Sequence, residues 1–128
     1  MAIPGSIAPS LSLRRSTQSG NKAMSAAYVA VYSDSSTAPW MFVSGEIDLS
    51  TMQVGDSIDI RVRKTMASGG TAIVDDTKTY TDAQPAGHQS THIGSIINVY
   101  GVEISMRQTA GVLRTLNCEF FDAKRLGL

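Results

Sequence analysis

Two histidines and three of the eight aspartates lie close enough in the sequence to be considered as ligands of a metal ion. His88 and His92 stand four apart, and on a strand such residues share a face about 13 Å apart, too far to bind one ion together. Asp75 and Asp76 are adjacent, so on a strand they point to opposite faces, and with Asp82 they lack the Asp/Asn/Gly spacing of a calcium loop. We therefore expect surface histidines and solvated acids, with no metal and no cofactor.

The single cysteine, Cys118, is the one thiol that could act as a nucleophile. It alternates with Leu116 and Phe120, which predicts a buried side chain, whereas a reactive thiolate must be exposed beside a base. The sequence has no Gly-x-Ser-x-Gly turn. The pair Gly69 and Gly70 opens no helix that could bind phosphate. These observations predict a protein that is not an enzyme.

Basic residues recur at positions that could form one positively charged stripe. Such a stripe could meet an acidic partner or the DNA inside a shell, but 11 Lys and Arg are balanced by 11 Asp and Glu. Asp59 and Glu103 fall on the same predicted strand faces, so a solvated sheet of mixed charge is favoured, and specific nucleic-acid binding is not expected. The basic residues are Arg14, Arg15, Arg61, Arg63, Lys64 and Arg107.

Aromatic residues gather in the first third of the chain. They could form a platform that stacks against sugars, which gives a carbohydrate or host-surface binding module as an alternative function. Packing in a core or an interface explains the same residues without a ligand. They are Tyr28, Tyr32, Trp40 and Phe42.

Strand-forming segments, separated by Gly, Ser, Asp or Pro, must position these residues. In Ser57–Arg63, Ile58, Ile60 and Val62 share one face while charged residues share the other, which is typical of a half-buried strand. The pattern predicts an all-β fold, an antiparallel β-sandwich or jelly-roll-like domain of seven to eight strands. The expected strands are 26–32, 40–48, 57–64, 71–80, 88–97, 100–108 and 112–121, with an eighth in the N-terminal segment.

The last two expected strands are predicted to form a hairpin. A three-residue loop, Thr109–Gly111, would pair Ile104 with Leu116 and Val102 with Cys118, so that core residues oppose core residues. The same register pairs Met106 with Arg114 and Tyr100 with Phe120. Gly111 would occupy the left-handed position of such a loop.

Two other connections carry predictions of their own. Residues 48–56 are expected to make one helical or 3₁₀ turn, capped by Asp48 or Ser50 and ended by Gly55, with Leu49 and Met52 closing one end of the sandwich. The loop at Met66–Gly70 is expected to be exposed.

Residues 1–22 are rich in Pro, Gly and Ser and are predicted to form an extended N-terminal arm with one edge strand. Disorder is the alternative. Residues 23–128 are expected to form the β-sandwich domain. The 128 residues suffice for one core, no apolar run reaches the roughly 20 residues of a membrane helix, and the start lacks the features of a signal peptide. We therefore expect no membrane contact and synthesis in a cytoplasm.

Several segments resemble small β-sandwich proteins encoded by tailed bacteriophages. They are Glu46–Asp56 followed by Ile58–Val62, Ser68–Thr71, Thr79–Pro85 and Ile104–Thr115, which includes Gln108–Gly111 as the most specific element. The resemblance covers roughly residues 45 to 122. It implies a virion structural protein, most specifically a capsid decoration or cement protein that binds the lattice of the major capsid protein.

These observations together predict where the chain contacts its partners, namely the major capsid protein and other copies of itself. A homo-oligomer is expected, and capsid symmetry favours a trimer at three-fold positions. The chain would be made in the host cytoplasm and reside on the capsid surface, while a head-tail or tail ring subunit is a further alternative. The predicted contact residues are Leu11, Leu13, Arg14, Arg15, Trp40, Ser68, Gly69 and Gly70.

Overall fold

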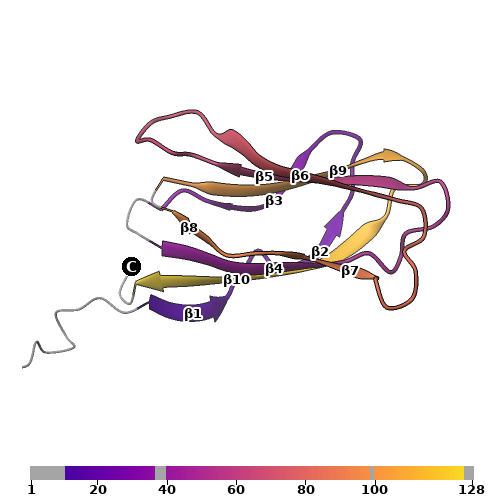
Figure 1. Ribbon diagram of the computed structural model, residues 1–128, viewed down its shortest axis with the longest axis horizontal. Coiled ribbons are helices and arrows are strands. Elements are labelled where there is room, and N and C mark those ends of the chain that lie inside the picture. Colours follow the sequence, from indigo (N-terminus) through magenta and orange to yellow (C-terminus); the bar gives the residue numbers. More distant parts are fainter. Residues whose placement is uncertain (1–10, 37–39, 99, 126–128) are drawn as a thin grey trace, which may run out of the picture.

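The structure is a computed structural model that describes residues 11–36, 40–98 and 100–125. Two antiparallel sheets lie face to face as a sandwich (Figure 1). Its strands are β1 (Leu11–Arg15), β2 (Gly20–Ala23), β3 (Val29–Asp34), β4 (Trp40–Asp48), β5 (Ser57–Lys64), β6 (Ile73–Thr81), β7 (Ser90–Ile93), β8 (Ile96–Asn98), β9 (Val102–Ala110) and β10 (Thr115–Arg125). No helix among the described residues is long and apolar enough to cross a membrane.

Sheet A has six strands in the order β1-β10-β4-β7, with β2 also paired to β10 and β8 also paired to β4. Sheet B has four strands in the order β3-β9-β5-β6. The predicted all-β, antiparallel sandwich is confirmed. The described residues form ten strands, more than the seven to eight expected, because residues 11–23 contribute two and the expected strand at 88–97 divides at Gly94 and Ser95.

The core lies between the sheets and is built mainly by alternation along the strands, which is interrupted where bulges shift the register between β3 and β9, β5 and β9, and β4 and β10. Ile58, Ile60 and Val62 of β5 face it, as predicted from their spacing. Cys118 is fully buried in the row with Leu116 and Phe120, which confirms its assignment to the core. Burial raises the pKa of its thiol to about 12, so the thiolate that a nucleophile needs is not formed near neutral pH.

The predicted C-terminal hairpin is wrong. β9 pairs with β3 and β5 in sheet B, whereas β10 pairs with β1, β2 and β4 in sheet A. The two strands therefore face each other across the core. Ile104 and Leu116 do share the core, but as residues of opposite sheets and not as neighbours in one sheet.

The connection between β9 and β10 is built around the Gln108 side chain. Its amide nitrogen donates to the carbonyl oxygens of Ala110 (3.0 Å) and Val112 (2.7 Å), and its oxygen accepts from the Arg114 backbone N–H (2.9 Å). Gly111 has a φ of 86°, the left-handed conformation expected of it. These contacts carry the chain from one sheet to the other.

Residues 49–56 close one end of the sandwich. Leu49 and Met52 are fully buried, which confirms their predicted place in the core. In place of a helix the segment forms two turns closed by hydrogen bonds three residues apart, from Met52 N–H to the Leu49 carbonyl oxygen and from Asp56 N–H to the Gln53 carbonyl oxygen, both at 3.1 Å. Asp48 accepts from the Ser50 backbone N–H (2.8 Å). The loop at Met66–Gly70 is exposed throughout, as predicted.

Residues 1–10 of the expected arm lie outside the described residues, and the rest of it runs along β10 as β1, a turn and β2. The turn also joins the two sheets along one lateral side of the sandwich. The Gln18 amide donates to the Ser33 carbonyl oxygen and accepts from the Ser33 N–H, both at 2.9 Å. Nearby, Lys124 of β10 pairs with Asp34 of β3.

Candidate interaction surface

An apolar row crosses the outer face of sheet A, the face directed away from the core. Leu13 of β1 lies opposite Ala123 of β10, Ala123 lies opposite Met41 of β4, and Met41 lies opposite Ile97 of β8. Leu13 is 66% exposed and Ile97 is 78% exposed. An outer sheet face normally carries polar residues, so Leu13 and Ile97 are exposed apolar side chains at the two ends of this row. Between them Met41 is half-buried and Ala123 is buried, 5% exposed. We call these four residues the apolar row.

The outward direction of the row follows from its neighbours. Trp40 and Phe42, on either side of Met41, are buried in the core. Asp122, next to Ala123, points toward the core, where it accepts from the Tyr32 hydroxyl (3.0 Å). Successive residues of a strand point to opposite faces, so Met41 and Ala123 point outward.

Two arginine ion pairs fix β1 and hence Leu13. Arg14 donates to the buried Asp122 (2.7 Å), which also accepts from the Tyr32 hydroxyl (3.0 Å). Arg15 makes a two-point contact with Glu119 on the outer face, at 3.0 and 2.9 Å. A two-point contact between an arginine and a carboxylate fixes the relative orientation of the two side chains and also stabilises the pair. The short edge strand is thereby held in one register along β10.

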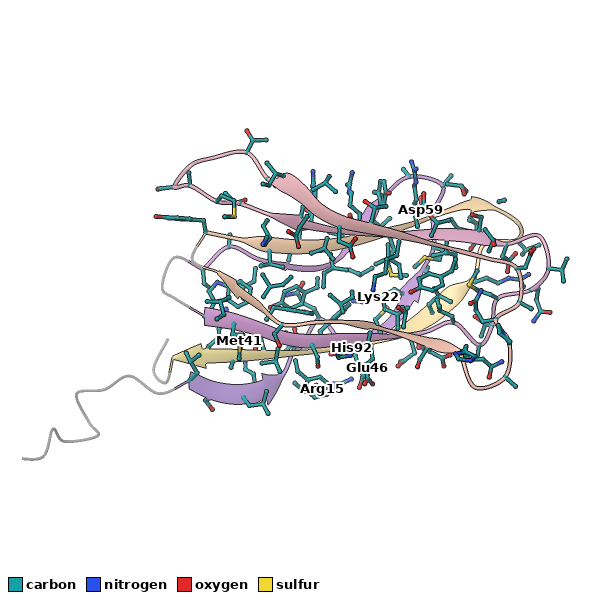
Figure 2. All side chains as sticks on the ribbon, in the orientation of Figure 1. Arg15, Lys22, Met41, Glu46, Asp59 and His92 are labelled. Atoms are coloured by element: carbon teal, nitrogen blue, oxygen red, sulfur yellow. The ribbon has the colours of Figure 1, made fainter. Side chains whose placement is uncertain are left out.

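Polar residues lie beside the apolar row on the same face. Glu119 of β10 lies opposite Glu46 of β4, and Glu46 lies opposite His92 of β7. Figure 2 shows Arg15, Glu46, His92 and Met41 together on sheet A, with Asp59 on the other sheet. The outer face of sheet A therefore combines an apolar strip with a charged strip, the composition of a surface that contacts another protein.

The charged residues on the outer face of sheet B also pair with one another. Arg63 contacts Glu103 (2.6 Å), and Asp59 accepts from Arg107 and from Thr79, both at 2.8 Å. This confirms the predicted sheet of mixed charge. Because Arg14 and Arg15 lie on sheet A, the basic residues do not form a single stripe.

Tyr28 completes the polar face of sheet B. The guanidinium carbons of Arg61 and Arg107 lie 3.8 and 4.5 Å from its ring centroid. Both arginines are therefore engaged by an aromatic ring as well as by polar partners, Ser105 in the case of Arg61 (3.2 Å).

The structure brings only some of the predicted contact residues together. Leu11, Leu13 and Arg15 alternate on the outer side of β1, whereas Arg14 between them contacts the buried Asp122. Ser68, Gly69 and Gly70 are exposed in the loop between β5 and β6, on sheet B. They therefore do not extend the apolar row.

Trp40 is not a surface residue, which corrects its assignment as a partner contact. It is 2% exposed and packs in the core with Tyr32, their ring centroids 6.4 Å apart. Tyr32 and Phe42 are also fully buried. The predicted sugar platform is therefore not formed, because three of its four rings fill the core.

The residues considered for metal binding do not gather into a site. His88 and His92 are both exposed, and no group of three or more His, Cys, Asp or Glu within the described ranges could hold an ion. Asp82 instead accepts from the Gly55 backbone N–H (2.8 Å) and so fixes a loop.

Sequence reasoning missed Met41, Ala123 and Ile97. A signal for Met41 was present, because Trp40–Val43 is apolar at every position and so supplies apolar side chains to both faces of a strand. Ala123 and Ile97 carried no comparable signal. Their place in the row depends on which strands pair and in which register.

No protein-family model and no curated protein matches the chain. Solved structures share its fold. One is a protein of Bacillus endospore appendages, which form disulfide-linked pili, with a TM-score of 0.55 and 14% identity over 91% of this chain and 89% of that one.

Two others are chains of infectious bursal disease virus, one being VP2 of its subviral particle and one from the Gx strain. Their TM-scores are 0.51 and 0.52 and their identities 9% and 11%, over 90% and 91% of this chain. The chain spans only 32% and 34% of their lengths. At these identities the likeness concerns the fold.

Proposed function

We propose that the chain is a non-enzymatic structural subunit of a tailed-phage virion that decorates the capsid by docking the outer face of sheet A on the major capsid protein lattice. The observation that carries the proposal is the apolar row, Leu13–Ala123–Met41–Ile97. Exposed apolar strips next to charged residues are typical of protein contact sites.

The fold and the charge of the chain support this proposal. Similar sandwiches occur in a viral capsid protein and in a pilus protein, so the fold suits subunits of large assemblies. The formal net charge of zero leaves little repulsion between copies packed on one surface. Many copies on a lattice add avidity, so each contact can be modest.

The attachment would be non-covalent. The single cysteine, Cys118, is fully buried in the core and its pKa is raised by that burial. A disulfide between subunits, of the kind that links the Bacillus pili, would require this thiol to leave the core. Affinity must therefore come from the surface residues of sheet A.

Co-sedimentation with capsids tests the proposal. Purified heads assembled without the chain are mixed with the wild-type protein or with the double variant Leu13→Lys, Ile97→Lys. Both side chains are exposed, so the variant should fold, but it places a charge at each end of the apolar row. We expect the wild type to sediment with the heads and the variant to lose at least about tenfold in affinity, because each lysine would place an unpaired charge in an apolar contact.

Val112→Lys is the matched control, because Val112 is also an exposed apolar residue (69%) but lies in the loop between β9 and β10. It should bind heads as the wild type does. Equal binding of the wild type and the double variant would refute docking through the apolar row. Copy number distinguishes decoration, with hundreds of copies in each particle, from a ring subunit with about a dozen.

A further inference from the structure

The two sheets have four lateral edges, and β6 is the longest of them. β3 is interrupted by a bulge between Ala30 and Tyr32, and its Ser33 backbone groups are bound by Gln18. The edges of sheet A are shorter, β1 and β2 with five and four residues and β7 and β8 with four and three. β6 has nine residues and pairs only with β5 within the described part of the chain. Its free backbone groups make it a template for another strand.

Charged side chains face inward from this edge. Asp76 lies opposite Val62 and Lys78 lies opposite Ile60, and both partners are core residues. Asp76 and Lys78 line a cavity of about 180 Å³ between β6 and the β7–β8 segment. Inward charges at an edge prevent pairing with a strand that lacks side chains of opposite charge at the opposed positions. A strand that carries the opposite charges at those positions could pair with β6.

We propose that β6 pairs antiparallel with β6 of a second copy of this chain, with Thr77 opposite Thr77, and so forms a two-fold dimer. In this register Asp76 lies opposite Lys78 of the second copy, and Lys78 lies opposite its Asp76. Each dimer then contains two directly opposed pairs of opposite charge, which stabilise an antiparallel pair. The inference does not depend on capsid decoration.

Other registers fail on charge or on side-chain direction. Centring the pair on Asp76 or on Lys78 opposes two like charges, which is destabilising. Centring it on Thr79 leaves Asp76 opposite Asp82, beyond the end of β6. Shifts by one residue would oppose an inward-facing residue with an outward-facing one.

The bulge in β6 limits the regular part of the pair to its centre. Residues 76–81 pair regularly with β5, and the irregularity lies at Asp75, where the register shifts. In the proposed register Asp75 falls opposite Thr79 of the second copy, so residues 76–78 of each copy form the regular centre of the pair. Beyond the bulge the side chains of Val74 and Tyr80 face opposite ways, and the pair ends there. The dimer joins two four-stranded sheets into one continuous sheet, and the like-facing side chains place the two-fold axis perpendicular to it.

Sedimentation analysis at increasing protein concentration tests the proposal. We expect the wild type to pass from monomer to dimer. Asp76→Lys and Lys78→Asp should each raise the dimer dissociation constant by about tenfold or more, because each turns both attractive pairs into like-charge pairs. An equimolar mixture of the two variants should form a heterodimer with both charge pairs restored. Recovery of dimerisation in the mixture would require the two substituted residues to face each other across two chains, so an effect within one chain could not produce it.

Glu46→Lys is the charge-matched control, since it changes the net charge as Asp76→Lys does but lies on sheet A. It should dimerise with itself and should not form a preferential heterodimer with Lys78→Asp. A wild type that stays monomeric at high concentration would overturn the proposal, and so would single variants that dimerise normally. Without any substitution, amide hydrogen exchange in β6 should slow as concentration rises, and exchange independent of concentration would also overturn it.

Discussion

Asp56 and Gly111 come so close that no side chain fits at position 111, in the turn between β9 and β10. A Cβ atom at Gly111 would lie 2.0 Å from an Asp56 carboxylate oxygen and 2.8 Å from the Asp56 Cα. The φ of 86° is also unfavourable for any residue with a Cβ. Gly111→Ala should therefore lower the free energy of unfolding by at least about 2 kcal/mol, as measured by denaturant titration.

Gly69→Ala separates the two causes. Gly69 also has a positive φ, 67°, but a Cβ there would meet nothing within 4 Å. We expect a loss of only about 1 kcal/mol, from backbone strain alone. Equal losses in the two variants would show that contact with Asp56 does not constrain the turn.

Residue-level prediction worked best where one strand decides the outcome. Cys118 was predicted to be buried because alternation with Leu116 and Phe120 is enough to assign a face. Trp40 was assigned to a contact surface, yet the same alternation with Phe42 places it in the core. An aromatic side chain fits both a core and an interface, so residue type alone could not decide.

Three loops at one end of the sandwich meet at Asp56, two at its carboxylate and one at its backbone carbonyl. It accepts from the Arg114 side chain (2.7 Å) and from the Gln53 backbone N–H (2.8 Å), and the Asp56 carbonyl oxygen accepts from the Asp82 N–H (2.8 Å). The Arg114 hydrogen bond, followed by that from Gln53, lowers the pKa of the Asp56 carboxyl below its ordinary value. Protonation of the Asp56 carboxylate would weaken the hydrogen bonds that hold these loops together, so the stability of this end of the sandwich decreases in acid.

The direction of this dependence follows from proton binding. In the unfolded chain Asp56 has its ordinary pKa of about 3.9, so on acidification the unfolded state binds the proton first. The stabilisation is complete above that pKa and is lost as the pH falls through the lower, folded value. Asp34, Asp48, Asp59 and Glu119 also have lowered pKa values and act in the same direction.

Asp56→Asn should reduce stability at pH 7 and make the loss of stability between pH 7 and acid pH smaller than in the wild type. Denaturant titrations at a series of pH values measure both effects. An Asp56 carboxyl that titrates above its ordinary value in an NMR titration of the wild type would contradict the assignment.

Elements were predicted well where charge and alternation mark both ends of a strand. The expected bounds of β4 and β5 coincide with the observed ones. The hairpin of β9 and β10 failed because alternation tells which face of a strand is buried but not which strand lies beside it. Two strands that face each other across a core satisfy the same pattern as two that pair. The apolar row escaped prediction for this reason, since its four residues come from four strands.

At the scale of the whole molecule, the proposed β6 dimer and the proposed docking through sheet A can form at the same time. The two-fold axis of the β6 pair is perpendicular to sheet B, so the sheet A faces of both copies point the same way, apart from the twist of the sheets. A dimer would therefore present two apolar rows to one surface. Two linked contacts bind a lattice more tightly than one, by roughly 10²-fold or more when the spacing fits.

Asp76→Lys should consequently weaken binding to capsids although it leaves the apolar row unchanged, because it removes the second contact of each dimer. Mixing it with Lys78→Asp should restore wild-type binding, whereas Leu13→Lys, Ile97→Lys should bind weakly even as a full dimer. Head-binding isotherms for these proteins, with dimer content measured in the same samples, check the three outcomes. If Asp76→Lys were monomeric and still bound heads as tightly as the wild type, each copy would dock alone and the dimer would serve another purpose.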